Sequence, residues 1–151
     1  MFAHLTHESV RAEQRLREER LFEQALHQKG GLLRRFLRRE VTPLREYEEA
    51  RAALESHHLY DRGTQTVCLD LIQGSVNRST DFDASFHPLR QHIKERWMRV
   101  AHAFLTGATL PPVELIQVGE AYYVVDGHHR ISVARALGQH YIDATVRAMP
   151  A

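Results

Sequence analysis

The sequence predicts an α+β protein: an N-terminal helical arm followed by a compact half in which short strands and helices alternate. Three observations carry this prediction. Residues 1–60 show helical spacing and capping signals. Residues 64–151 contain short β-branched and aromatic runs separated by glycine and proline. The stretch Tyr122–Gly138 joins one such run to a helix through a glycine turn. We therefore divide the chain into an N-terminal helical region, residues 1–60, and a domain over residues 64–151.

The composition is that of an ordinary globular protein. Of the 151 residues, 43% are hydrophobic and 26% are charged, and the formal net charge is +1. This balance argues against a protein that coats nucleic acid by charge alone. The single cysteine, Cys68, excludes an internal disulfide and fits a reducing compartment. The N-terminus shows neither a signal-peptide pattern nor a long apolar span, so we expect a cytoplasmic protein with no membrane partner.

Helices are expected throughout the N-terminal region. Thr6 can cap a helix from about His7 to Gln28, and Thr42-Pro43 is a favourable start for another that extends to about Ser56. The first helix has only a thin apolar stripe. A homo-oligomer formed through the N-terminal helices belongs to the non-enzymatic alternative given below.

A short helix is expected between these two, over Leu32–Arg39, with an apolar arc on one side and a basic ridge on the other. The ridge would contact DNA phosphates, or it is a solvated face that the neighbouring Glu-rich segments neutralise. Its members are Arg34, Arg35, Arg38 and Arg39.

The second half should form a small sheet with one long helix before it and one inside it. The long helix spans Arg90–Leu105, and its only tryptophan, Trp97, is expected in the core. Gly119-Glu120 predicts a two-residue turn between two strands. The expected strands are Gln65–Ile72, with or without a helical turn at its end, Val113–Val118, Ala121–Val125 and Tyr141–Val146.

The corner after the strand Ala121–Val125 is the candidate functional site. Asp126-Gly127 breaks the strand, and a helix is expected to open at His129 or Arg130. Such a corner aims free backbone N–H groups at one point, and the helix dipole adds partial positive charge there. Arg130 and the imidazoles of His128 and His129 would complete a small anion pocket.

The run Asp126-Gly127-His128-His129-Arg130, followed by Ala134, resembles the nucleotide-phosphate motif of the ParB/sulfiredoxin superfamily. Leu110-Pro111-Pro112-Val113 before the strand pair and residues 138–142 after the helix fit the same pattern. The resemblance covers roughly Thr64 to Ala148. It implies a domain with a small mixed β-sheet flanked by helices. It does not fix the reaction, because members of that superfamily bind DNA, cleave nucleic acid, phosphorylate serine or repair peroxiredoxins.

The resemblance also suggests a further residue and excludes one activity. It implies that Arg78, in the loop at residues 74–80, faces the same pocket as Arg130, whereas an ordinary polar loop is the alternative reading. Sulfiredoxin chemistry is set aside. It needs a cysteine directly before His-Arg, and His128 occupies that place here; an imidazole cannot form the sulfur intermediate.

The first functional hypothesis is nucleotide binding with phosphoryl transfer or hydrolysis. Gly127, His128, His129 and Arg130, together with Arg78, would bind the phosphates of ATP, ADP or CTP, and Mg²⁺ would bridge the phosphate oxygens.

Catalytic roles under this hypothesis go to groups around the turn. Asp126 is the expected metal ligand and catalytic carboxylate, and Glu114 on the neighbouring strand is a second catalytic candidate. His129, or His128, would act as acid or base near neutral pH.

Two other classes of function stay open. One is a DNA-associated ParB-like module or a nuclease, and the other is a non-enzymatic nucleotide sensor or oligomerisation protein. A zinc or iron site from Asp126, His128 and His129 is less favoured, because successive residues at a tight turn point in different directions. A capped turn with packed histidines is the structural alternative to all of these.

Overall fold

The computed structural model describes residues 6–27, 44–56, 58–76, 81–83 and 85–150. The expected helix at Leu32–Arg39, its four arginines, the start signal Thr42-Pro43 and Arg78 lie outside these residues. The helices are α1 His7–Leu26, α3 Leu44–Ser56, α4 Lys94–Leu105 and α5 His128–Ala136, with short 3-10 turns at Leu69–Leu71 and Gln91–Ile93. The strands are β1 Tyr60–Cys68, β2 Ile72–Ser75, β3 Val113–Val118, β4 Ala121–Asp126 and β5 Tyr141–Ala148.

The strands form a mixed sheet in the order β1-β5-β3-β4-β2. The β1–β5 and β3–β4 pairs are antiparallel, and the β5–β3 and β4–β2 pairs are parallel. The hairpin predicted at Gly119-Glu120 joins β3 to β4, and Gly119 adopts the left-handed φ of 61° that such turns need. The predicted α+β class, with a small mixed sheet flanked by helices and an N-terminal helix, is confirmed.

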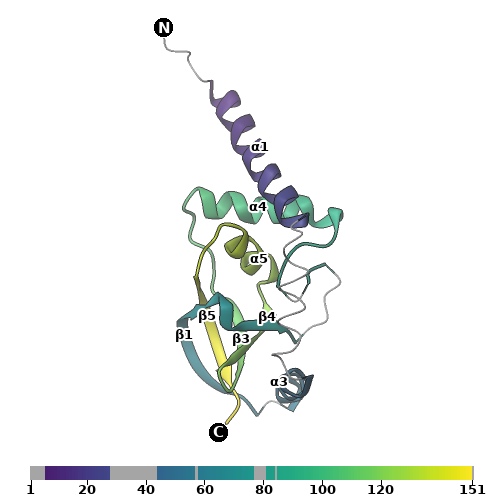
Figure 1. Cartoon of the computed structure of the whole chain (residues 1–151). Helices are drawn as coiled ribbons and strands as arrows, with labels where there is room; N and C mark the ends of the chain where they lie inside the picture. Colours follow the sequence, from purple (N-terminus) through teal and green to yellow (C-terminus); the bar gives the residue numbers. More distant parts are fainter. Residues whose placement is uncertain (1–5, 28–43, 57, 77–80, 84, 151) are drawn as a thin grey trace.

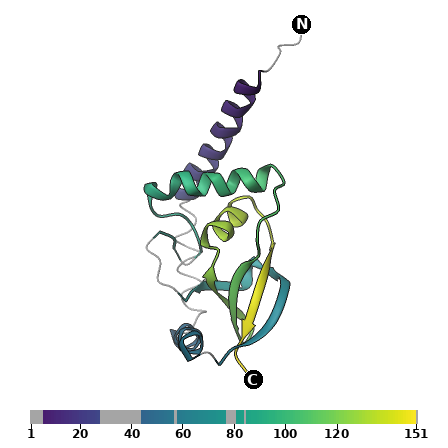
Figure 2. The same ribbon diagram turned by 180° about the vertical axis from the view of Figure 1, so that it is seen from behind.

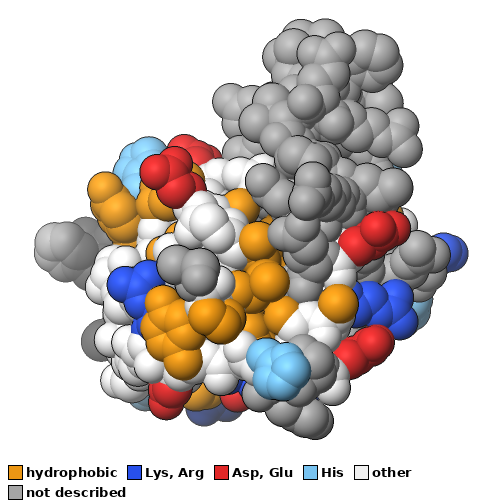
Figure 3. Space-filling view, turned by 90° about the horizontal axis from the view of Figure 1, so that it is seen from below, with side chains coloured by type: hydrophobic (Ala, Val, Ile, Leu, Met, Phe, Trp, Pro, Cys, Tyr) orange, Lys and Arg blue, Asp and Glu red, His pale blue; other side chains and the backbone are white. Residues whose placement is uncertain are grey.

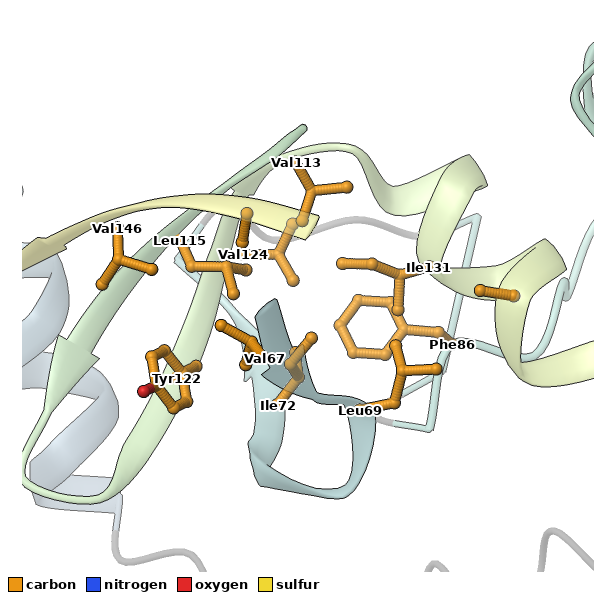
Figure 4. Close-up of a cluster of buried hydrophobic side chains, with 12 residues drawn as sticks. Val67, Leu69, Ile72, Phe86, Val113, Leu115, Tyr122, Val124, Ile131 and Val146 are labelled. Carbon is orange, nitrogen blue, oxygen red and sulfur yellow. The ribbon is translucent and has the colours of Figure 1, made fainter. Parts of the chain in front are cut away.

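Helices cover both faces of this sheet. On one face, Ile131 of α5 packs among apolar side chains of the strands, including Val113 and Val124, and against Phe86 (Figure 4). Each fully buried side chain of this size contributes about 1.5–3 kcal/mol. On the other face, Ala50 of α3 packs with Ile116 and neighbours from the hairpin. The corner after β4 therefore lies above a packed core, which fixes where α5 begins.

The outermost helix, α1, packs the buried apolar side chains of its second half against α4. The ring of Phe22 meets the edge of Trp97 at 5.4 Å between centroids, and both residues are fully buried. The predicted core position of Trp97 is thus confirmed. The N-terminal end of α1 extends away from the rest of the molecule (Figures 1 and 2). A homo-oligomer through the N-terminal helices stays a prediction.

Several boundaries differ from those expected. α5 begins at His128, earlier than the predicted His129 or Arg130, because Gly127 itself takes the left-handed N-cap conformation. β1 begins at Tyr60 and ends at Cys68, where a 3-10 turn separates it from β2. Of the two alternatives left open for this segment, the strand followed by a helical turn is confirmed, although the strand starts five residues earlier than Gln65. The expected loop at Gly74-Ser75 is wrong, because these residues pair with β4 as part of β2.

Seen from below, the molecule shows a group of hydrophobic side chains with charged side chains around it (Figure 3).

Within the described parts of the chain, no helix has both the length and the apolar character needed to cross a bilayer.

Candidate functional site

Gly127 makes the corner between β4 and α5 possible. Its φ of 109° and ψ of 24° lie in the left-handed region. A Cβ atom at this position would lie 2.5 Å from Cγ1 and 2.7 Å from Cβ of Val113, on the adjacent strand. Only glycine allows α5 to start this close to β3.

The sharp corner leaves backbone donors at the start of α5. The N–H of Ile131 makes the first intrahelical hydrogen bond, to the Gly127 carbonyl at 3.0 Å. The amides of His128, His129 and Arg130 come before this bond and have no acceptor within the helix. They belong to the helix end that carries partial positive charge.

The guanidinium of Arg130 is largely occupied by the protein itself. Its Nη1 donates to the carbonyls of Pro111 at 2.5 Å and Pro112 at 3.0 Å, and its Nη2 donates to Asp126 Oδ2 at 3.0 Å. The Arg130 side chain is 15% exposed, whereas that of Asp126 is 68% exposed. Arg130 therefore ties the segment before β3 to the turn, and its first role is to position the corner.

His128 points inward toward β2. Its Nε2 shares a hydrogen bond of 2.6 Å with the Ser75 hydroxyl, and its ring lies near the rings of Phe82 and Phe86. Burial lowers the pKa of His128, and the nearby Asp126 carboxylate opposes this only in part. The imidazole is therefore neutral at pH 7.

His129 is also neutral, and more strongly so. Burial, followed by the positive charge of Arg96 and by His128, lowers its pKa to about 4. Its ring meets Phe82 edge-on at 5.0 Å, and its Nε2 is buried without a hydrogen-bond partner among the described residues. The two imidazoles therefore contribute hydrogen-bonding capacity to the site rather than positive charge.

A tightly wound loop holds the phenylalanines against these histidines. The Asp83 carboxylate accepts hydrogen bonds from the N–H groups of Ser85 at 2.8 Å and His87 at 2.9 Å. Burial opposes ionisation of Asp83, but the hydrogen bonds from His87 and Ser85 outweigh it and keep its pKa below the ordinary value. Phe86 adopts a positive φ of 63°, a conformation that costs a non-glycine residue about 1–3 kcal/mol.

An open hollow of about 490 Å³ lies in front of the start of α5. Gly127, His128, His129 and Arg130 line it from one side, as expected, together with Asp126. The opposite walls come from the loop around Phe82, from α4 and from the segment before β3.

Arg96 of α4 is the cation that reaches this hollow with an exposed side chain. Sequence reasoning missed it, because the segment around it reads as a helix with an apolar stripe and Arg96 lies outside that stripe. No local pattern marks it; only the packing of α4 on α5 brings it opposite the turn. In this structure it adds an exposed positive charge to the hollow, beside Arg130, to which the sequence assigned that charge.

The Glu114 carboxylate, the second catalytic candidate, lies on the strand beside Asp126. Glu114 on β3 is the register partner of Asp126 on β4, so both extend to the same side of the hairpin. Glu114 is exposed and is not part of the hollow's lining. Among the described residues no three His, Cys, Asp or Glu side chains gather in a way that could hold a metal ion. A Mg²⁺ ion at Asp126 would therefore need phosphate oxygens and water as its other ligands.

Comparisons with known proteins give one kind of match. No family model matches the chain, and no curated protein matches it. Among solved structures, the crystal structure of sulfiredoxin from Arabidopsis thaliana is similar, with 19% identity and a TM-score of 0.44 over 56% of this chain and 84% of that one. The fold class of this chain rests on its own sheet and helices.

Proposed function

We propose that this protein binds a nucleotide and that the phosphates lie in the hollow at the start of α5. The observation that carries the proposal is the position of Arg96, whose exposed side chain lines the same hollow as the first residues of the helix. A helix N-terminus and a guanidinium that point at one space are the two groups that proteins most often use for phosphate.

The free energies of these two interactions indicate that phosphate alone binds weakly in the hollow. A hydrogen bond to a charged group contributes about 1.5–3 kcal/mol, and a helix terminus adds up to about 2 kcal/mol. Together they reach about 2–5 kcal/mol, whereas a Kd of about 1 mM already requires about 4.1 kcal/mol. Useful affinity therefore needs further contacts, which a nucleoside, a Mg²⁺ ion or both would provide.

The residues around the turn take different parts in this proposal. Arg130 holds the corner in place and adds its charge from behind. The neutral imidazole of His129 offers a hydrogen bond rather than a charge, so it would act as a donor or a weak base. Arg78 remains a proposed further phosphate contact on the resemblance alone.

Phosphoryl transfer or hydrolysis is the reaction that we propose for the bound nucleotide. Asp126 would hold Mg²⁺ through an exposed carboxylate, with Glu114 beside it as a second carboxylate for the ion or an acceptor hydroxyl. We expect Asp126→Asn to remove turnover of ATP or CTP while binding is kept. Product analysis by chromatography tests this step, and an intact wild-type nucleotide after long incubation would favour the sensor function instead.

Binding itself is tested by calorimetry with ATP, ADP and CTP in the presence of Mg²⁺. We expect Arg96→Ala to weaken binding about tenfold or more, because it removes the exposed cation and costs about 1.4 kcal/mol or more. Arg99→Ala is the matched control: it removes an exposed arginine from the same helix, on the flank that faces α1. Equal affinities for the two variants, or no binding by the wild-type protein, would contradict the proposal.

A further inference from the structure

A second hollow, of about 320 Å³, adjoins the proposed phosphate site. Leu110, Pro111 and Arg130 line both hollows, so the two meet across this segment. The proposed phosphate site uses none of the other residues that line the second hollow.

The second hollow arises from the register of the sheet. Val113, the first residue of β3, is level with Ala144 of β5. The preceding residues of β5, from Tyr141 to Asp143, therefore lie beside the loop that leads into β3 rather than beside a strand. The hollow forms between this loop and the start of β5.

Its walls combine an open aromatic ring with polar groups. Tyr141 is 61% exposed, although it lies in a strand. Asp143 lies two residues further along β5, so both side chains extend from the same face, about 6.6 Å apart along the strand. The hydroxyl of Thr66, the register partner of Asp143 on β1, donates to Asp143 Oδ1 at 3.2 Å and orients that carboxylate. The half-buried Phe104 adds apolar surface.

We propose that this second hollow receives the nucleoside of the same ligand. The base stacks on the exposed ring of Tyr141, since every nucleobase offers a flat face for such stacking. Asp143 accepts hydrogen bonds from the ribose hydroxyls, as carboxylates do in other nucleotide sites. The ligand crosses the segment at Leu110-Pro111, with its phosphates at α5 and its ribose at β5. This assignment rests on the proposed nucleotide function and makes the ligand a ribonucleotide.

The chain offers a matched control for the tyrosine. Tyr60 is 50% exposed and lies at the opposite end of the same β1–β5 ladder, where it pairs with Ala148. Tyr141 pairs with Cys68 at the end next to the hollow. Replacing either tyrosine removes a similar exposed ring from the same two strands, but only one of them lies beside the proposed nucleoside site.

The experiment compares three probes with Mg²⁺ in NMR titrations, which measure millimolar affinities: ATP, 2′,3′-dideoxy-ATP and inorganic tripolyphosphate. We expect Tyr141→Ala to weaken ATP binding about fivefold or more and to leave tripolyphosphate binding unchanged, whereas Tyr60→Ala changes neither. We expect the wild-type protein to prefer ATP over the dideoxy compound and Asp143→Asn to lose that preference.

The outcomes separate the two proposals. If tripolyphosphate binds, depends on Arg96 and binds as tightly as ATP, the nucleoside site is overturned while the phosphate site stands. If Tyr141→Ala and Tyr60→Ala behave alike toward ATP, the nucleoside site is overturned as well. If neither ATP nor tripolyphosphate binds the wild-type protein, both proposals are overturned.

Discussion

The two flanks of α4 show how differently the same kinds of side chain are used. Toward α1, three charged groups of α4 are paired: Lys94 donates to Glu19 at 2.5 Å, His102 contacts Glu18 at 2.6 Å, and Glu95 accepts from Arg15 at 2.9 Å. Toward α5, Arg96 faces the hollow, and no ion-pair partner for it lies among the described residues. The first flank attaches an arm to the body, and the second flank leaves a cation available for a ligand.

The same difference separates the two arginines of the hollow. Arg130 belongs to the run that the sequence singles out, yet two proline carbonyls and Asp126 occupy its guanidinium. Arg96 has no such partners in the part of the chain that the structure describes, and it belongs to no motif. The motif therefore identifies Arg130, which holds the corner in place. The exposed positive charge comes from Arg96 on the neighbouring helix α4.

The largest effect is expected at the corner, for Gly127→Ala. The added Cβ would meet Val113 at 2.5 Å in a left-handed backbone, so strain and overpacking together should cost about 2–5 kcal/mol of the free energy of unfolding. Gly138→Ala is the control, since its φ is also positive, at 74°, but no heavy atom lies within 4 Å of the added Cβ. Urea denaturation of both variants measures the difference, and equal losses would mean that the close approach to Val113 is unimportant.

An intermediate effect is expected for the pH dependence of stability. Because the pKa of His129 is about 4 in the folded protein against 6.5 ordinarily, the unfolded chain binds the proton more readily between these values. The contribution of neutral His129 to stability is therefore complete above pH 6.5 and is lost as the pH falls toward 4. His128 acts in the same direction.

The replacement His129→Gln should flatten this dependence. After discounting for its partial exposure, we expect about 1–2 kcal/mol of the acid-induced loss of stability to disappear. The free energy of unfolding, measured with urea from pH 7.5 to 4, gives the slopes of the two proteins. Parallel curves would show that His129 titrates normally and that its imidazole is exposed to water.

The smallest effect is expected on the flank that faces α1, for Arg15→Ala. Its ion pair with Glu95 is exposed on both sides, at 62% and 66%, and such pairs contribute less than about 1 kcal/mol. The buried contact of Phe22 with Trp97 holds the arm instead. Thermal denaturation should show almost no change. A large loss would mean that ion pairs, rather than this apolar contact, attach α1.

Local patterns in the sequence were enough to predict most of the described elements. Periodicity gave the helix around Trp97, the turn at Gly119 and the strand–glycine–helix corner. Long-range contacts were beyond such patterns. The carbonyls that bind Arg130 come from residues 18 and 19 positions earlier, and the Ser75 hydroxyl lies 53 positions before His128. The approach of Arg96 likewise depends on how α4 packs on α5, which no short motif encodes.

The most direct test of the phosphate site is a titration of ¹⁵N-labelled protein with Mg²⁺ and ATP. We predict that the backbone amides of His128, His129 and Arg130 and the side-chain N–H of Arg96 show the largest chemical-shift changes, because these donors surround the proposed phosphate. Shifts confined to other parts of the chain, or no shifts at saturating nucleotide, would contradict the account.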